Sequence, residues 1–260
     1  MSAPRVRQAG LLRVEIHPDR AALGHAAGLA VADHLRALLA RRGHARVIFA
    51  CAPSQDEFLA ALIAASRSPE RGFDWSRVTA FHMDDYVGFA ADHPRSFRRY
   101  LHAHLLDHVP VGAFHALPAE RPPAEACAAY AALLAAAPID LICLGIGENG
   151  HLAFNDPPVA DFDDPALVKV VALDDACRRQ QVNDGCFPTF ADVPTHALTL
   201  TLPVFRAAHR LSVHVPGPRK AAAVRATVHD PRGPACPATL LREHPDATLY
   251  VDEAAAAELR

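Results

Sequence analysis

The sequence has few lysines, no closely spaced cysteine pair and no long apolar segment, and each absence excludes a class of protein. Only two of its 26 basic residues are lysines, Lys169 and Lys220, and the formal net charge is −3. This balance lacks the basic surface of nucleic-acid-binding proteins. No apolar run reaches the roughly 18 residues that cross a membrane, and no signal peptide is recognisable. We therefore expect a cytoplasmic protein without nucleic-acid or membrane partners; a homo-oligomer stays open.

The six cysteines are scattered, and no two are separated by only two residues. This spacing predicts neither a zinc knuckle nor a redox motif. Cys51 and Cys143 lie in apolar segments and are expected to be small core residues. Among the 16 histidines, His104 and His108 are four apart on a predicted helix. Because the spacing suggests no third ligand, we expect no metal site.

Segments of strand length alternate with segments of helical periodicity along most of the chain. Strands are predicted at 46–51, 78–82, 139–144, 167–173, 197–202, 211–215 and 247–251. Helices are predicted at 19–42, 54–66, 94–108, 122–136 and 218–228. The alternation predicts an α/β fold: a single Rossmann-like domain over residues 11–260 whose mostly parallel sheet has helices on both faces. Residues 1–10 are expected to form a flexible N-terminal arm.

A glycine-rich turn, GIGENGHLAFNDP at residues 145–157, follows the strand predicted at 139–144. Parallel sheets bind ligands at the carboxyl ends of their strands. The turn can position His151, which can move a proton near neutral pH, and Asp156 can orient it. The spacing of Gly145, Gly147 and Gly150 also matches the dinucleotide fingerprint. Prolines directly after Asp156 end any helix too early to face a pyrophosphate, so no cofactor is expected.

Two adjacent acids, Asp84 and Asp85, follow the strand predicted at 78–82. Adjacent carboxylates repel, so one of them can hold a raised pKa and act as a base; a polar turn is the structural alternative. Lys220 lies in the first turn of the helix predicted at 218–228, after the strand at 211–215. A lysine at that position is unfavourable for the helix dipole unless an anion is bound nearby. The alternative is an ordinary lysine exposed to solvent. Ser54 can cap a helix, bind phosphate, or do both.

Together these segments resemble the glucosamine-6-phosphate deaminase (isomerase) family, which is related to the 6-phosphogluconolactonases. The resemblance covers about residues 45–253 and rests on FHMDDYVGF from residue 81, LGIGENGHLAFNDP from residue 144, ALTL from residue 197 and the pair Gly217 and Lys220. It implies an enzyme that needs no redox cofactor and converts an amino-sugar phosphate to a ketose phosphate and ammonia. The segment around 159–169 does not resemble the family's allosteric site.

The resemblance also implies roles for individual residues. Asp84 matches the base that moves a proton between C2 and C1, and His151 matches the acid that opens the sugar ring. Asp156 stands where the family usually has a glutamate that partners this histidine. Lys220 matches the lysine that binds the phosphate. Ser54, Gly147 and Asp85 are the further residues expected to contact the substrate.

Several positions depart from the family pattern. Asn149 replaces an aspartate, and an amide cannot take up a proton; it is nevertheless expected in the catalytic group. Similar turns with asparagine occur in galactosamine-6-phosphate members, so the sugar stays undefined. The family's glycine- and threonine-rich phosphate loop is replaced by residues 51–55, and Arg178 and Arg179 are the nearest candidates for its phosphate arginine. A lactone hydrolase and a non-catalytic sugar-phosphate sensor remain as alternatives.

Overall fold

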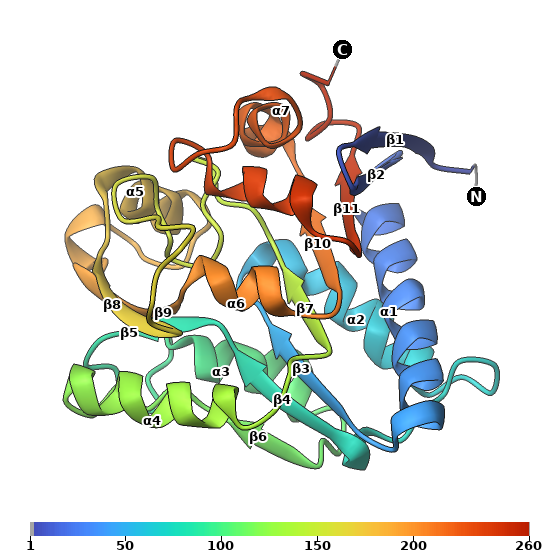
Figure 1. Cartoon of the computed structure of the whole chain (residues 1–260), viewed down its shortest axis with the longest axis horizontal. Helices are drawn as coiled ribbons and strands as arrows, with labels where there is room; N and C mark the ends of the chain where they lie inside the picture. The colour runs from blue at the N-terminus through green and yellow to red at the C-terminus, as the bar shows by residue number, and fades with distance from the viewer. Residues whose placement is uncertain (1–2, 260) are drawn as a thin grey trace.

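The computed structural model describes residues 3–259 and shows helices packed around a large sheet, with a small sheet at one side (Figure 1). Within these residues the large sheet has eight strands in the order β1-β2-β11-β10-β7-β3-β4-β6. Its strands are β1 (Arg5–Ala9), β2 (Leu12–His17), β3 (Ala45–Phe49), β4 (Val78–His82), β6 (Ala113–His115), β7 (Leu141–Leu144), β10 (Leu211–Val215) and β11 (Ala247–Asp252). Every neighbouring pair is parallel except β1 and β2. The expected α/β fold with a mostly parallel sheet is confirmed.

Helices cover both faces because successive strand residues point to opposite sides. In β3, Val47 and Phe49 belong to one apolar cluster, and Ile48 belongs to the other. The first face is covered by α1 (Arg20–Arg42), α2 (Asp56–Ser66), α3 (Phe97–Leu101) and a π-helical turn at His102–Leu106. The second is covered by α4 (Pro123–Ala135), α6 (Leu202–Ala207), α7 (Ala221–His229) and a 3₁₀ segment at Pro237–Glu243. No helix within residues 3–259 is long and apolar enough to span a membrane.

The small sheet was not predicted from the sequence. Its strands are β5 (Asp84–Tyr86), β9 (His196–Leu200) and β8 (Val168–Ala172), and both pairs are antiparallel. The segments 167–173 and 197–202 are therefore strands, as predicted, but they lie outside the parallel sheet. Helix α5 (Asp175–Asn183), also unpredicted, follows β8. The apolar pattern of a segment identifies a strand but does not identify the strand with which it pairs. The sequence therefore did not show that these two strands belong to a separate sheet.

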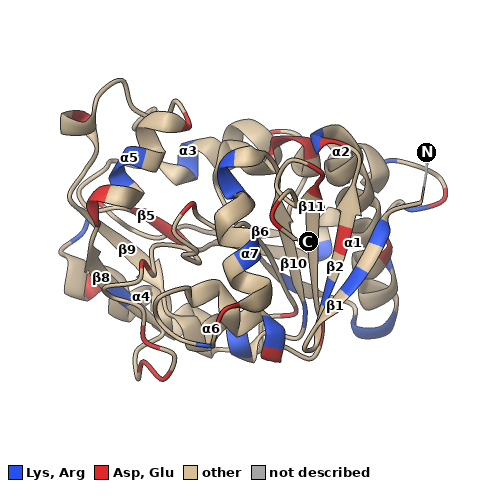
Figure 2. Ribbon diagram, turned by 90° about the horizontal axis from the view of Figure 1, so that it is seen from above, with Lys and Arg blue, Asp and Glu red and all other residues tan. Residues whose placement is uncertain are grey.

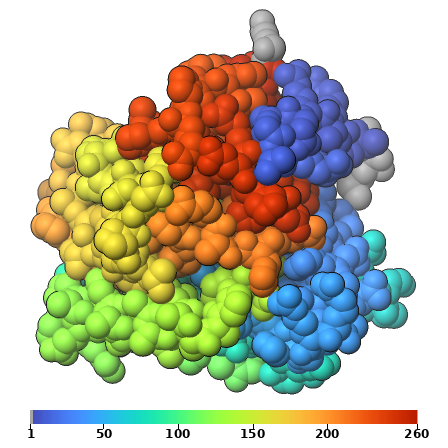
Figure 3. Space-filling view, in the orientation of Figure 1, coloured from blue at the N-terminus to red at the C-terminus, as the bar shows by residue number. Residues whose placement is uncertain are grey.

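The N-terminal segment also differs from the expectation of a flexible arm. Residues 5–9 form β1 and pair with β2 through a turn at Gly10, where φ is +61°. All residues of β1 except Ala9 are exposed. An exposed strand can be as polar as a loop, which is why the sequence did not indicate a strand here. Since β2 pairs with β11, the first and last segments of the described chain lie side by side (Figure 3). Residues 1 and 2 of the predicted arm lie outside the described part.

Helices α1 and α2 approach closely at two glycines of α1. A Cβ atom added to Gly28 would lie 2.6 Å from the Cβ of Ala61, and one added to Gly24 would lie 2.4 Å from the Cβ of Glu57. Distances this short require the two helices to separate. The contact holds α2 against α1 and therefore fixes the segment that joins β3 to α2.

We expect Gly28→Val to lower the free energy of unfolding by about 1 to 3 kcal/mol, because the added side chain overpacks this contact. Chemical denaturation followed by circular dichroism measures the change. Ala37→Val, on the exposed side of the same helix, is the matched control and should cost only its helix propensity, about 0.5 kcal/mol. Equal losses in both variants would show that the α1–α2 contact is not tightly packed.

Candidate active site

A polar pocket lies at the carboxyl edge of the parallel sheet, where segments from four strands meet. This is the edge at which α/β sheets bind ligands. Its polar lining consists of Ser54 and Gln55 after β3, Asp84 after β4, His151 after β7, Lys220 after β10, and Gln180, Gln181 and Asp184 from α5 and its end. Five of the expected site residues, Asp84, His151, Lys220, Ser54 and Gly147, therefore line one cavity.

His151 is held in one orientation by two neighbours. Its Nδ1 lies 2.9 Å from Oδ1 of Asp156 and 2.8 Å from Oδ1 of Asn149. The Nδ2 of Asn149 donates to the same Asp156 oxygen at 2.9 Å. Because both neighbours of Nδ1 are acceptors, Nδ1 carries the ring proton and Nε2 is free to accept one. Asn149 thus orients the ring, although it cannot itself exchange the proton.

Asp156 is fully buried, and this burial by itself disfavours its charge. Hydrogen bonds and charge interactions with His151 oppose the burial, and the hydrogen bond from Asn149 adds to them, so the pKa of Asp156 is lowered. The carboxylate therefore stays ionised beside the imidazole. An ionised Asp156 stabilises a protonated His151, as a proton-transfer pair requires.

The glycine turn is shaped to admit the His151 ring. A Cβ atom on Gly147 would lie 2.1 Å from Cε1 of His151, so any side chain there would displace the ring. Gly150 has a φ of +84°, which favours glycine, and a Cβ there would meet Sγ of Cys236 at 2.6 Å. The glycines of the turn thus leave room for the His151 ring and for Cys236.

Asp84 faces the pocket and is almost fully buried. Burial, with the nearby charges of Asp85 and Asp156, raises the pKa of Asp84 well above its ordinary value. His82 fixes its backbone: the Nε2 of His82 accepts from the amide of Leu117 at 2.8 Å, so its Nδ1–H donates to the Asp84 carbonyl at 2.9 Å. Burial lowers the pKa of His82 to about 3, which keeps this ring neutral.

Asp85 points away from the pocket, because adjacent residues of β5 face opposite sides. Its Oδ2 accepts from Nε of Arg98 at 2.8 Å, and its Oδ1 accepts from the amides of Tyr86 and Phe97. Both carboxylate oxygens are thus used within the fold, and Asp85 does not line the cavity. Of the two adjacent acids, the structure thus places only Asp84 in the pocket.

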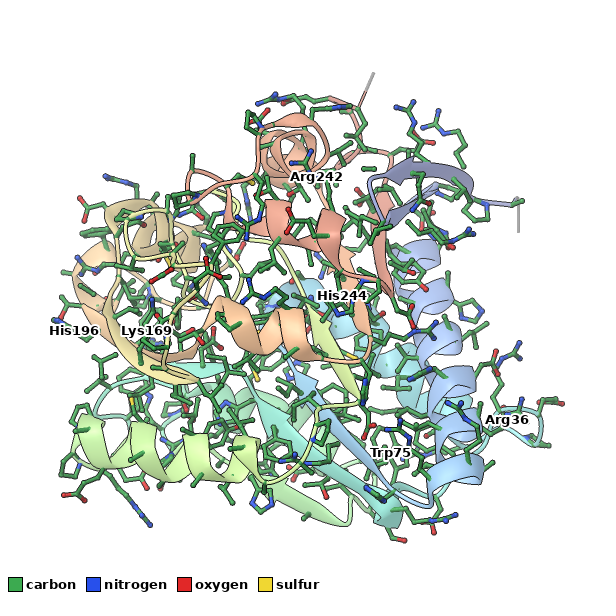
Figure 4. All side chains as sticks on the ribbon, in the orientation of Figure 1. Arg36, Trp75, Lys169, His196, Arg242 and His244 are labelled. Carbon is green, nitrogen blue, oxygen red and sulfur yellow. The ribbon has the colours of Figure 1, made fainter. Side chains whose placement is uncertain are left out.

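Lys220 is buried, lines the pocket and lies in the 3₁₀ turn Pro218–Lys220 that follows β10. Burial lowers the pKa of Lys220, while Asp184 and Glu148 oppose the shift. No side-chain or backbone oxygen of residues 3–259 accepts a hydrogen bond from its ammonium group. The other lysine, Lys169, instead donates to the carbonyl of Val159 and pairs with an acid on the β8 side of the molecule (Figure 4). A buried ammonium without an acceptor suits a bound anion.

Neither predicted phosphate arginine reaches the pocket. Arg178 donates to two carbonyl oxygens and lies over the Phe190 ring, and Arg179 is exposed on α5. A second cavity beside the pocket is lined instead by Arg20 and Arg219, and it shares Ser54 and Lys220 with the pocket. Elsewhere basic and acidic residues are interspersed along the ribbon (Figure 2).

Two residues of α5, Gln180 and Gln181, were missed because that helix was not predicted. Gln181 accepts from the hydroxyl of Tyr86 at 2.9 Å, and Gln180 accepts from the amide of Glu148 at 2.8 Å. Both join α5 to the segments that carry Asp84 and His151. A polar run flanked by Asp174 as an N-cap was the available signal for the helix.

One group of side chains in the described part has metal-ligand types close together. Ligand atoms of His151, Asp156 and Cys177 all lie within 4.8 Å of one another. Nδ1 of His151 and Oδ1 of Asp156 already contact each other and Asn149. His104 and His108, considered from spacing, each contact a backbone carbonyl and do not converge on a common point.

The fold and the pocket define an α/β protein with a polar pocket at one edge of its sheet, lined by an acid, an imidazole and an ammonium group. Residues 18–250 match the profile of the family described as glucosamine-6-phosphate isomerases/6-phosphogluconolactonase, and the chain belongs to this family.

Relatives agree with this assignment. The chain is 36% identical over 247 residues to a glucosamine-6-phosphate deaminase of an Arthrobacter species, covering 90% of this chain and 88% of the relative. It is 38% identical over 184 residues to one of an Exiguobacterium species, covering 70% of each. The solved structure of a monomeric glucosamine-6-phosphate deaminase superposes with a TM-score of 0.84 at 25% identity, over 94% of this chain and 99% of the other. The 6-phosphogluconolactonase of Trypanosoma brucei shares the fold, with a TM-score of 0.74 at 18% identity over 98% of this chain and 100% of the other.

The two adjacent acids should differ in their effect on stability. Burial outweighs the interactions with Arg98 and raises the pKa of Asp85 as well. Asp85→Asn nevertheless leaves the buried Arg98 with Glu120 as its remaining acid, so we expect a loss of about 3 kcal/mol in the free energy of unfolding. Asp84 has a raised pKa, so its ionisation destabilises the fold as pH rises above the ordinary carboxyl value of 3.8. Asp84→Asn should therefore be at least as stable as the wild type at pH 7. Urea denaturation of both variants at pH 7 measures this, and equal losses would contradict the assignment.

Proposed function

We propose that the protein is an amino-sugar-phosphate deaminase/isomerase, which converts glucosamine-6-phosphate or an epimer to a ketose 6-phosphate and ammonia. The observation that carries the proposal is the meeting of Asp84, His151 and Lys220 in one cavity. A carboxylate with a raised pKa suits proton abstraction, an oriented imidazole suits proton transfer between oxygens, and a buried ammonium suits a phosphate. The named activity of relatives at 36% and 38% identity supports the same reaction.

His151 is proposed to open the sugar ring. Its free Nε2 takes the proton of the anomeric hydroxyl and then returns it to the ring oxygen as the C1–O5 bond breaks. The protonated ring is stabilised meanwhile by Asp156, whose carboxylate contacts Nδ1. The proton is conserved, and the product is the open-chain aldehyde.

Asp84 is proposed to move the next proton. It removes the hydrogen from C2, which gives an enolamine, and it delivers a proton to C1. The resulting C2 iminium ion adds water, and ammonia leaves from C2 to give the ketose phosphate. The reaction consumes one water per sugar and needs no redox cofactor.

Asn149 is the residue that bears on which amino-sugar epimer the protein prefers. It donates to Asp156 and accepts from His151, so it can hold the ring but adds no second charge beside it. Ring opening then depends on Asp156 alone for electrostatic support. We propose that this difference alters the preferred epimer or the rate of ring opening rather than removing the activity.

The function is tested by the release of ammonia from purified protein supplied with 2-amino-2-deoxyhexose 6-phosphates of both the gluco and galacto series. We propose a cytoplasmic enzyme, consistent with these soluble substrates. Consumption of 6-phosphogluconolactone above its spontaneous rate, without ammonia from either sugar, would replace the proposal with lactone hydrolysis. Thermal stabilisation by sugar phosphates without any turnover would favour a sensor.

Asp84→Asn should lower kcat by about 10²- to 10⁴-fold, because an amide cannot accept the C2 proton. Ammonia release at saturating substrate measures the loss. Exchange of the C2 hydrogen with deuterium from solvent reports the same step independently and should fall in parallel. Unchanged exchange in the variant would remove Asp84 from its role.

The dependence of kcat/KM on pH should reveal the raised pKa of Asp84. The base acts only when ionised, so kcat/KM should increase as pH rises through the pKa of Asp84, and the midpoint should lie above the ordinary value of 3.8. A pH profile of ammonia release measures it. An acid limb at the ordinary carboxyl value would contradict the raised pKa.

Lys220→Met should raise KM for the sugar phosphate by about 10- to 100-fold, because the phosphate loses a charge-assisted hydrogen bond. Inorganic phosphate should also become a weaker competitive inhibitor of the Lys220→Met variant. Lys169→Met, at the lysine that is paired on the other side of the molecule, is the matched control. A larger effect of Lys169→Met would contradict the assignment of the anion site.

A further inference from the structure

Behind Ser54, a chain of buried polar side chains leads away from the pocket. Nε2 of Gln55 donates to Oγ of Ser54 at 3.0 Å, and Oε1 of Gln55 lies 2.8 Å from Nδ1 of His214. Nε2 of His214 lies 2.8 Å from Oγ of Ser212. Gln55, His214 and Ser212 are all buried, so their proton arrangement is set by the protein rather than by solvent.

The geometry permits one consistent arrangement of these protons. The amide nitrogen of Gln55 also lies 3.3 Å from the backbone carbonyl of His214. If the Gln55 amide were flipped, its oxygen would face the carbonyl oxygen of His214, and two acceptors would meet. The amide nitrogen of Gln55 therefore faces that carbonyl, and the amide oxygen faces Nδ1 of the His214 ring. Nδ1 of His214 therefore carries its proton and donates to Gln55, and Nε2 accepts from the hydroxyl of Ser212.

The ring of His214 cannot easily change this arrangement. It stacks on Phe58 with ring centroids 3.8 Å apart, which fixes its plane. Burial lowers the pKa of His214 to about 3, so the ring stays neutral across the physiological pH range. Gly145 packs against the Gln55–Ser54 hydrogen bond. A Cβ at Gly145 would lie 3.2 Å from the Gln55 nitrogen and 3.4 Å from the Ser54 oxygen.

This proton arrangement determines where the hydroxyl hydrogen of Ser54 can point. Because its oxygen accepts from Gln55, its own hydrogen must point elsewhere, and no acceptor for it is present among residues 3–259. Ser54 lines both cavities, as Lys220 does. The hydroxyl and the ammonium therefore present donors to the same space, which suits a ligand that only accepts hydrogen bonds, such as a phosphate dianion.

We propose that Gln55 and His214 are positioning residues that hold the Ser54 hydroxyl as a hydrogen-bond donor to the substrate's phosphate beside Lys220. The proposal rests on the proposed function in so far as the phosphate belongs to an amino sugar. It assigns part of the phosphate binding to a neutral relay of hydrogen bonds, beside a pocket that neither Arg178 nor Arg179 lines. The relay spans β10 and the 3₁₀ turn Pro53–Gln55, so residues far apart in the sequence act on one hydroxyl.

The relay is tested by a double-mutant cycle on phosphate binding. Calorimetric titration with inorganic phosphate is carried out on the wild type, Ser54→Ala, Gln55→Met and the double variant. Each single variant should bind phosphate about three- to tenfold more weakly, the value of one hydrogen bond. The double variant should bind no more weakly than Ser54→Ala alone, because Gln55 acts through Ser54. Additive losses would overturn the proposal.

A matched control is provided by Gln180→Met, which also removes a buried amide from the pocket but has no contact with Ser54. Its effect should add to that of Ser54→Ala. Gln55→Glu should weaken phosphate binding more than Gln55→Met, because a carboxylate attracts the Ser54 hydrogen inward and repels the anion. Phosphate binding by Gln55→Glu equal to that of the wild type would contradict the relay.

Kinetics separate positioning from a general structural role. Gln55→Met should raise KM for the sugar phosphate with kcat largely unchanged, whereas a fall in kcat at unchanged KM would overturn the proposal. If no amino-sugar phosphate is turned over, the proposed function fails, but the phosphate titrations still decide the relay. If the wild type turns over the sugar and Gln55→Met binds phosphate normally, the relay fails and the function stands.

Discussion

The contact between the His151 ring and the Asp156 carboxylate is the interaction on which the rest of the site depends. It requires Gly147, since any Cβ there would occupy the place of the ring, and it requires Asn149, which holds both partners. It also leaves the outer ring nitrogen free. The glycine turn can therefore be understood as the means by which a strand end presents an imidazole to a cavity. The same sequence spacing in a dinucleotide-binding fold would present backbone amides instead.

Buried charges are the second constraint on this edge of the sheet. Asp84 and Lys220 are both buried without a partner among residues 3–259, whereas the neighbouring Asp85 is fully bonded. Burying an unpaired ion opposes folding, so such groups persist where a ligand or a reaction uses them. The contrast between Asp84 and Asp85 shows how alternation along a short strand places one acid in the pocket and bonds the next within the fold. Sequence spacing alone could not make that distinction.

Much of the parallel sheet followed from the sequence, because its strands are short apolar runs bounded by turn residues. The strands predicted at 78–82 and 211–215 match β4 and β10 residue for residue. The antiparallel sheet could not be predicted, since β5 has three residues, two of them acidic, and its partners are distant in sequence. Helix α5 was missed because its polar composition gives little apolar period. As a result, Gln180 and Gln181 were absent from the expected site. Asp85 was expected there because the sequence does not tell which of two adjacent acids faces the pocket.

Strand β10 carries His214, the 3₁₀ turn that follows β10 carries Lys220, and Ser54 lies in the turn after β3. The two donors proposed to hold the phosphate thus follow two strands of the large sheet, while His151 lies on the loop after β7 and Asp84 lies in the small sheet. Under the proposed function, a substitution in the turn that carries His151 or in the small sheet can therefore change the contacts with the sugar while the supports of the two phosphate donors stay in place.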